Sequence, residues 1–120
     1  MGIIYVGSAC ADNSLSVLSY TVPGGNSIDY WKNNFHHIVV TMEGNEGNTS
    51  FTRKLYFQGQ LVASNTINKS LKPAYAFRLG YGDTADYYKT YDEMFISKPL
   101  TDAEIQYIYN SGNGRSWDDL

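Results

Sequence analysis

The chain has 120 residues, of which 18% are charged, 15% are aromatic and 42% are apolar, and its formal net charge is −3. This length predicts one domain, and the apolar fraction is enough for a single core, which excludes intrinsic disorder. Basic residues form no cluster that could neutralise phosphates, and no run approaches the roughly 18 apolar residues of a membrane helix, so we expect neither a nucleic-acid partner nor membrane insertion.

The composition and the first third of the chain predict β structure. The 11 tyrosines favour pleated, half-buried surfaces, and the 11 glycines provide turns. Alternating apolar residues predict strands at 3–7 and 15–20, a proline–glycine cluster predicts a turn at 23–26, and residues 28–31 are predicted to form a weaker strand or an extended loop. The single cysteine, Cys10, excludes an intrachain disulfide, and we expect it to be half-buried in or beside a strand.

The best candidate for a central strand lies at residues 35–42. Its run of Ile38, Val39 and Val40 is β-branched, which favours burial on both faces of a sheet. A surface loop is predicted at 43–50, where glycine, asparagine and two acidic residues gather.

A hairpin and two further strands are predicted in the second half of the chain. The hairpin strands, 53–58 and 60–66, meet at a tight turn on Gln58-Gly59, where glycine supplies the positive φ that such turns need. The two strands that follow are predicted at 75–81 and 91–97.

A capping box predicts one helix near the C-terminus. Thr101 and Glu104 are spaced so that each side chain can bond the backbone amide of the other, and Gly112 is the expected C-cap. The apolar stripe expected to pack on the sheets follows at helical spacing: Ile105, Ile108 and Tyr109. About seven short strands and one terminal helix indicate an antiparallel β-sandwich or jelly roll.

Three segments carry a family resemblance. They are the sequence Phe-His-His-Ile-Val-Val-Thr at 35–41, the hairpin at 54–63, and the strand 91–96 with the helix start at 99–105. In this order they resemble the laminin-G-like and pentraxin-like domains of the concanavalin A-like lectin/glucanase superfamily. The resemblance implies an all-β, antiparallel jelly-roll sandwich with one short C-terminal helix, formed by a lectin-like domain over 1–112 and followed by a tail over 113–120.

The sequence departs from the family pattern at two places. Phe35 stands where the family has tryptophan, and we expect it to remain a core aromatic. The strands with which such domains open are absent before the segment at 3–6, so the resemblance implies an incomplete sandwich. Because an incomplete sandwich exposes strand edges, we expect a protein neighbour or an upstream segment to complete it.

The resemblance also implies a candidate calcium site. Family members often hold calcium with loop carboxylates and carbonyls, and the matching loop here contains Asp83 and Asp86. Calcium takes about six to eight oxygen ligands, so carbonyls, water or acids from other loops, such as Asp12 or Glu43, would have to complete the set. The alternative, and the more frequent case for two loop acids, is that both are simply solvated.

Aromatic residues gather at the same loop. Jelly-roll lectins stack sugars on exposed rings and hold the hydroxyls with acidic and amide side chains. We therefore predict contact with a carbohydrate or another surface ligand at five residues of this loop: Tyr81, Asp83, Asp86, Tyr87 and Tyr88. Two alternatives stay open, because tyrosine rings also pack along the rim of a sandwich or serve in protein interfaces.

Catalysis is not expected. Glycan hydrolases of this fold need two carboxylates facing each other across a cleft, whereas Asp92 and Glu93 are adjacent and so point to opposite faces of a strand. His36 and His37 likewise point to opposite faces, and one of them is expected to be a core or hydrogen-bonded residue.

The sequence therefore predicts a non-catalytic, lectin-like module for recognition or adhesion, located outside the cell or on a virion surface. Calcium is the one cofactor that the pattern suggests. The alternative function belongs to a different class: a structural or decoration protein of a phage-like virion or another assembly, which packs against protein neighbours.

Overall fold

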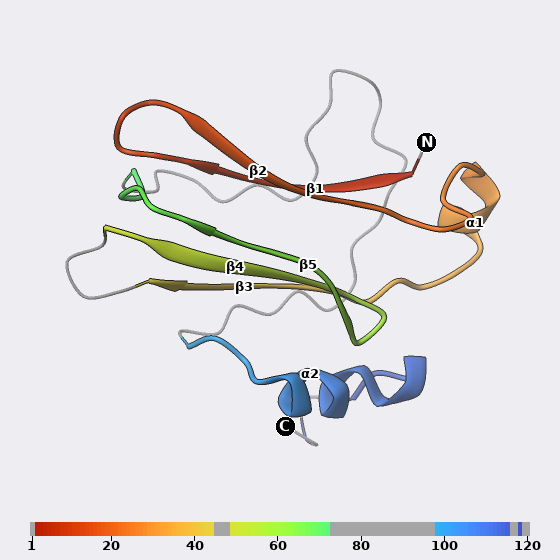
Figure 1. Cartoon of the computed structure of the whole chain (residues 1–120). Helices are drawn as coiled ribbons and strands as arrows, with labels where there is room; N and C mark the ends of the chain where they lie inside the picture. Colours follow the sequence, from red (N-terminus) through yellow and green to blue (C-terminus); the bar gives the residue numbers. More distant parts are fainter. Residues whose placement is uncertain (1, 45–48, 73–97, 116–117, 119–120) are drawn as a thin grey trace.

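The computed structural model of the chain describes residues 2–44, 49–72, 98–115 and 118 (Figure 1). It is mostly β, with one two-stranded and one three-stranded antiparallel sheet, a five-residue helix and a short C-terminal helix. This confirms the all-β prediction in its coarser form. The strands predicted at 75–81 and 91–97 lie outside the described residues.

The first sheet is the hairpin of β1 (Ile3–Ala9) and β2 (Leu15–Thr21). The two strands pair antiparallel, from Ile3 opposite Thr21 to Ala9 opposite Leu15. Both predicted strands are confirmed, and β1 runs two residues further than expected. Cys10 follows directly after β1 as a free, fully buried thiol, which is deeper than the half-buried position predicted for it.

The second sheet has the order β3–β4–β5, formed by Ile38–Gly44, Phe51–Phe57 and Gln60–Ile67. The turn between β4 and β5 has φ of 51° at Gln58 and 74° at Gly59. Two successive positive φ values characterise the tight hairpin turns whose twist matches that of the flanking strands. The predicted hairpin and its turn are therefore confirmed.

Three layers stack along the molecule, with the first sheet above the second and α2 below it (Figure 1). Alternate residues of β4 face the two neighbouring layers. Arg53 bonds to β1 and β2 on one side, whereas Tyr56 bonds to α2 on the other. Within the described ranges, the buried apolar residues are Cys10, Leu18, Val22, Phe51, Leu55, Tyr56, Phe57 and Ile105.

The C-terminal helix α2 (Asp102–Tyr109) begins at the predicted capping box. The Thr101 hydroxyl accepts from the Glu104 amide, and the Glu104 carboxylate accepts from the Thr101 amide. Ile105 of the predicted stripe is fully buried, and the Asp102 carboxylate accepts a hydrogen bond of 2.6 Å from the Tyr56 hydroxyl. The N-terminal end of the helix is thereby fixed to β4.

The predicted C-cap of α2 is wrong. Asn110, not Gly112, ends the helix in the left-handed conformation, with φ of 47°. Asparagine tolerates this conformation because its short polar side chain bonds locally, here to the Gly114 carbonyl at 2.8 Å. Gly112, with φ of 91°, instead closes the short 3-10 turn at Asn110–Gly112.

The weak strand predicted at 28–31 is also wrong, since Ile28–Lys32 forms the short helix α1. The Ser27 hydroxyl accepts from the Asp29 amide, with an acid in the first turn and Lys32 in the last. These are the capping and charge preferences of a helix, and they outweigh the β propensity of the residues between them.

The prediction for β3 is wrong in its start and in its burial. The strand begins at Ile38 rather than Phe35, and the ring of Phe35 is 80% exposed instead of lying in the core. Gly44 belongs to β3, so the strand extends into the predicted surface loop. Three apolar side chains on one face of β3, here called the β3 row, remain 39–45% exposed: Ile38, Val40 and Met42.

Within the described ranges, no helix has the length and apolar character needed to cross a membrane.

Candidate functional site

The residues predicted to contact a ligand or calcium lie outside the described residues. This holds for the complete set: Tyr81, Asp83, Asp86, Tyr87 and Tyr88. The candidate sites that the structure does describe are a loop network at Asp12, a buried arginine between the sheets, a histidine–aromatic cluster at the two helices, and the β3 row.

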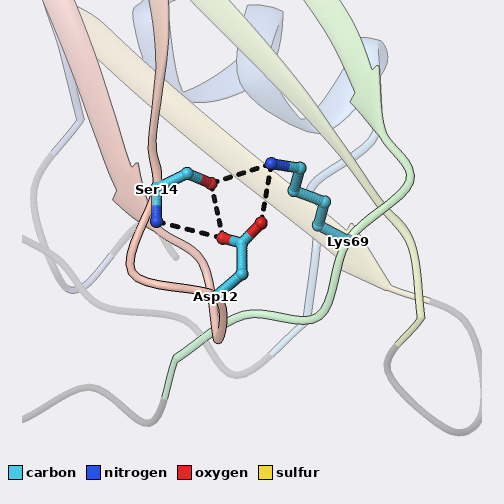
Figure 2. A network of polar contacts seen from close by, with 3 residues as sticks. All are labelled: Asp12, Ser14 and Lys69. Carbon is cyan, nitrogen blue, oxygen red and sulfur yellow. Dashed lines mark hydrogen bonds and ion pairs between the residues drawn. The ribbon is translucent and has the colours of Figure 1, made fainter.

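The loop network joins the turn after β1 to the segment after β5 (Figure 2). The Asp12 carboxylate accepts from the Ser14 amide at 3.0 Å, from the Ser14 hydroxyl at 2.5 Å and from the Lys69 ammonium at 2.8 Å. The hydrogen bond from Lys69, followed by those from Ser14, holds the pKa of Asp12 well below its usual range. Asp12 is therefore a charged acceptor that organises the loop.

This network argues against two chemical roles. Asp12, considered above as an additional calcium ligand, already has the Lys69 ammonium on its carboxylate. Lys69 also lies 2.9 Å from the Ser14 hydroxyl, but bonding to Asp12 raises the pKa of the lysine, so its amine stays protonated and is unsuited to act as a base. Across the described ranges, no group of three or more histidine, cysteine, aspartate or glutamate side chains could hold a metal ion.

Arg53 is the most buried charged residue that the structure describes, with no exposed surface. Its guanidinium donates to both strands of the first sheet and to β5. The acceptors, at 2.9–3.1 Å, are the Val6 and Ser16 carbonyls, the Ser8 and Ser16 hydroxyls and the Asn65 side-chain oxygen.

All of these acceptors are neutral. Burial lowers the pKa of Arg53, since the charged form loses its hydration, and the hydrogen bonds replace part of that hydration. Arginine suits this role because its planar head carries five donors in fixed directions. Arg53 thus fixes the position of one sheet on the other, which is a structural task.

The third candidate site is an aromatic cluster where α1 meets the start of β3. The His36 ring stacks on Tyr30 at 4.8 Å and on Phe57 at 5.7 Å, with Trp31 at 4.9 Å. The Trp31 indole donates to the Gly25 carbonyl at 2.8 Å, which holds α1 against the turn before it. The cluster therefore attaches α1 to the end of β4.

His37 contacts the other helix. Its ring lies 5.6 Å from that of Tyr109 in α2, and its backbone amide donates to the Gln58 side chain at 2.9 Å. The two histidine rings thus contact different helices, in agreement with the prediction that they point to opposite faces. The Nδ1 atoms of His36 and His37 are both buried, and neither has a hydrogen-bond partner in the described part of the chain.

The β3 row lies on the interior face of its sheet. Ile38, Val40 and Met42 pair with Phe57, Leu55 and Arg53 of β4, and directly paired residues point to the same face. The β4 residues of this face are at most 7% exposed, whereas the β3 row is 39–45% exposed. An interior-facing apolar row is therefore left partly uncovered at the β3 side of the sandwich.

Sequence reasoning missed the buried arginine, helix α1 and the exposure of the β3 row. A signal for Arg53 was present, because Phe51, Leu55 and Phe57 share its alternation and predict a buried position at 53. A signal for α1 was also present in the capping serine at 27. The β3 row has no local signal, since its exposure depends on what the other sheet covers.

No family model, curated protein or solved structure matches the chain. The family resemblance carried by the hairpin and the capped helix thus stays a prediction.

Proposed function

We propose that the chain is a non-catalytic structural module, a lectin-like jelly-roll sandwich that is completed by packing its β3 row against a second copy of the same chain. This is the assembly function anticipated as the alternative to a lectin, and it is suited to a virion or another ordered particle. The proposal includes the finer fold, in which the two sheets belong to one jelly roll.

One observation carries the proposal, the partial exposure of the β3 row. Ile38 is 45%, Val40 44% and Met42 39% exposed, although their partners on β4 form the core. Contiguous apolar surface of this kind marks interaction sites on soluble proteins. A second copy is a suitable partner because a two-fold axis beside β3 would pack the row on itself.

Light scattering across a range of concentrations tests the proposal. We expect the wild-type chain to be a dimer or higher oligomer, and Val40→Asp to shift it to the monomer by placing a charge in the interface. The control is Leu61→Asp, which changes another exposed apolar residue, paired with Tyr56 on the opposite face of the sheet. A wild-type chain that stays monomeric at high concentration, or equal effects of both variants, would overturn the proposal.

Carbohydrate recognition is the second candidate function. It is supported by the grouping of Tyr81, Tyr87 and Tyr88 with Asp83 and Asp86 in the sequence. A glycan array tests it, and we expect binding that is weakened by Tyr88→Ala. Loss of the same binding with a calcium chelator would support a calcium-assisted site, and an array without binding would exclude the lectin function.

A further inference from the structure

The chain contains only two histidines, and they are adjacent at 36 and 37. Histidine is the side chain whose ordinary pKa places its change of charge between about pH 5 and 8. Any histidine titration of this protein therefore comes from these two rings. Both rings present a buried Nδ1 atom that has no hydrogen-bond partner among the residues that the structure describes.

The surroundings of His36 fix the arrangement of its ring. Its Nε2 lies 3.1 Å from the Tyr30 carbonyl, which can only accept, so Nε2 carries the hydrogen and Nδ1 carries the lone pair. The ring lies among those of Tyr30, Trp31 and Phe57, and it packs α1 against the sheet.

The surroundings of His37 favour its neutral form. Its ring packs beside Tyr109 of α2, and burial lowers its pKa below the ordinary value of 6.5. Protonation would place a second N–H group and a positive charge at the contact between α2 and the sheet. The Gln58 side-chain oxygen accepts from the His37 backbone amide, and among the described residues no group bonds to the Nδ1 atom of the ring.

The acidic groups on the two helices are directed elsewhere or lie in solvent. In α2, Asp102 accepts from Tyr56, and Glu104 is bonded to Thr101 and Lys98 at the far end of the helix. In α1, the only acid is the exposed Asp29. Among the described residues, Tyr30 and Tyr109 are the titratable side chains in ring contact with the histidines, and neither supplies a carboxylate for an imidazolium.

We propose that His37 is a pH-sensitive switch, which holds α2 against the β3–β5 sheet when its ring is neutral and releases the helix when the ring is protonated. The direction follows from linkage. A histidine that resists protonation in the folded chain binds its proton in the unfolded chain first, so stability is complete above about pH 6.5 and decreases as the pH falls.

Denaturant unfolding at about pH 7.5 and about pH 5 tests the switch, and the range stays above the ordinary titration of carboxylates. We expect the unfolding equilibrium constant to rise at the lower pH, because the unfolded chain takes up the His37 proton first. His37→Phe keeps a ring beside Tyr109 but cannot titrate, so it should remove most of this increase.

Nuclear magnetic resonance of the wild-type chain keeps the test decisive if a variant fails to fold. We expect the His37 imidazole to titrate below the ordinary histidine pKa in the folded protein. The ring resonances of Tyr109 should shift in step with His37 as α2 is released. Titration of His37 at or above its ordinary pKa, or a His37→Phe variant that keeps the full pH dependence, would overturn the proposal.

Discussion

Strands β3 and β4 are neighbours in one sheet and are built from similar apolar residues, yet their burial differs. On the interior face, Leu55 of β4 has no exposed surface, whereas its direct partner Val40 of β3 is 44% exposed. The difference arises in the next layer. The first sheet bonds to β4 through Arg53, which also donates to Asn65 of β5, whereas β3 stands at the end of the described strand order β3–β4–β5.

This comparison teaches that the pattern of a strand specifies which face is interior, but not whether that face is covered. The continuous β-branched run at 38–40 predicted a central, fully buried strand. The run does lie on an interior face, but covering it requires a layer that the described part of the molecule does not place there. Substitutions on the two strands should therefore have different effects.

The largest effect is expected at Arg53, which couples β4 to the first sheet. Arg53→Ala removes the guanidinium that donates to the Ser8, Ser16 and Val6 oxygens and leaves a cavity, so we expect a loss of about 3–5 kcal/mol in the free energy of unfolding. Urea unfolding followed by circular dichroism measures it. Arg53→Lys should recover only part of the lost free energy of unfolding, because one ammonium group cannot replace the several donors of the planar guanidinium. A loss below about 1 kcal/mol would contradict the coupling.

The directly paired residues Leu55 and Val40 give the closest test of the comparison. Leu55→Ala should cost about 2–5 kcal/mol, since the residue is fully buried, and Val40→Ala about 1 kcal/mol or less for a half-exposed side chain. Both are measured by urea unfolding at low protein concentration. Equal costs would contradict the comparison. A cost of Val40→Ala that grows with concentration would instead indicate that a second copy covers the β3 row, as proposed above.

Much of the fold could be predicted from the sequence because its signals are local. The turn at Gln58-Gly59, the alternation in β1 and β2, and the capping box of α2 each involve residues within a few positions of one another. The errors have two sources. At α1, capping by Ser27 outweighed β propensity, and at the end of α2 a left-handed Asn110 replaced the expected glycine.

The candidate sites were less predictable than the fold. The partners of Arg53 come from β1, β2 and β5, between 12 and 47 residues away in the sequence. No local pattern predicts a contact between residues so far apart. The same holds for Lys69, which reaches Asp12 across 57 residues. The predicted ligand residues from Tyr81 to Tyr88 remain a prediction, because they lie outside the described residues.

A smaller effect is expected at Gly59, where the β4–β5 turn meets α2. A Cβ at this position would lie 2.6 Å from the Tyr109 ring, on a backbone with φ of 74°. Gly59→Ala should therefore cost about 2 kcal/mol, from backbone strain and from displacement of the helix. Gly114→Ala is the matched control, with φ of 65° and open space around its Cβ, and should cost about 1 kcal/mol or less. Thermal unfolding compares them, and equal losses would show that α2 does not press on the turn.

The smallest effect is expected at Tyr56, on the face of β4 that contacts α2. Tyr56→Phe removes the hydrogen bond to Asp102 but keeps the ring, so we expect a loss of about 1 kcal/mol at neutral pH.

Burial, followed by the bond to the Asp102 carboxylate, raises the pKa of Tyr56 to about 12. Because the unfolded chain loses this proton near pH 10, wild-type stability should decrease as the pH rises through that range, and Tyr56→Phe should lack this component. Ultraviolet titration of the folded chain should show a late tyrosine ionisation that is missing from the variant. If the late ionisation persists in Tyr56→Phe, it belongs to another tyrosine, and the bond from Tyr56 to Asp102 is not its cause.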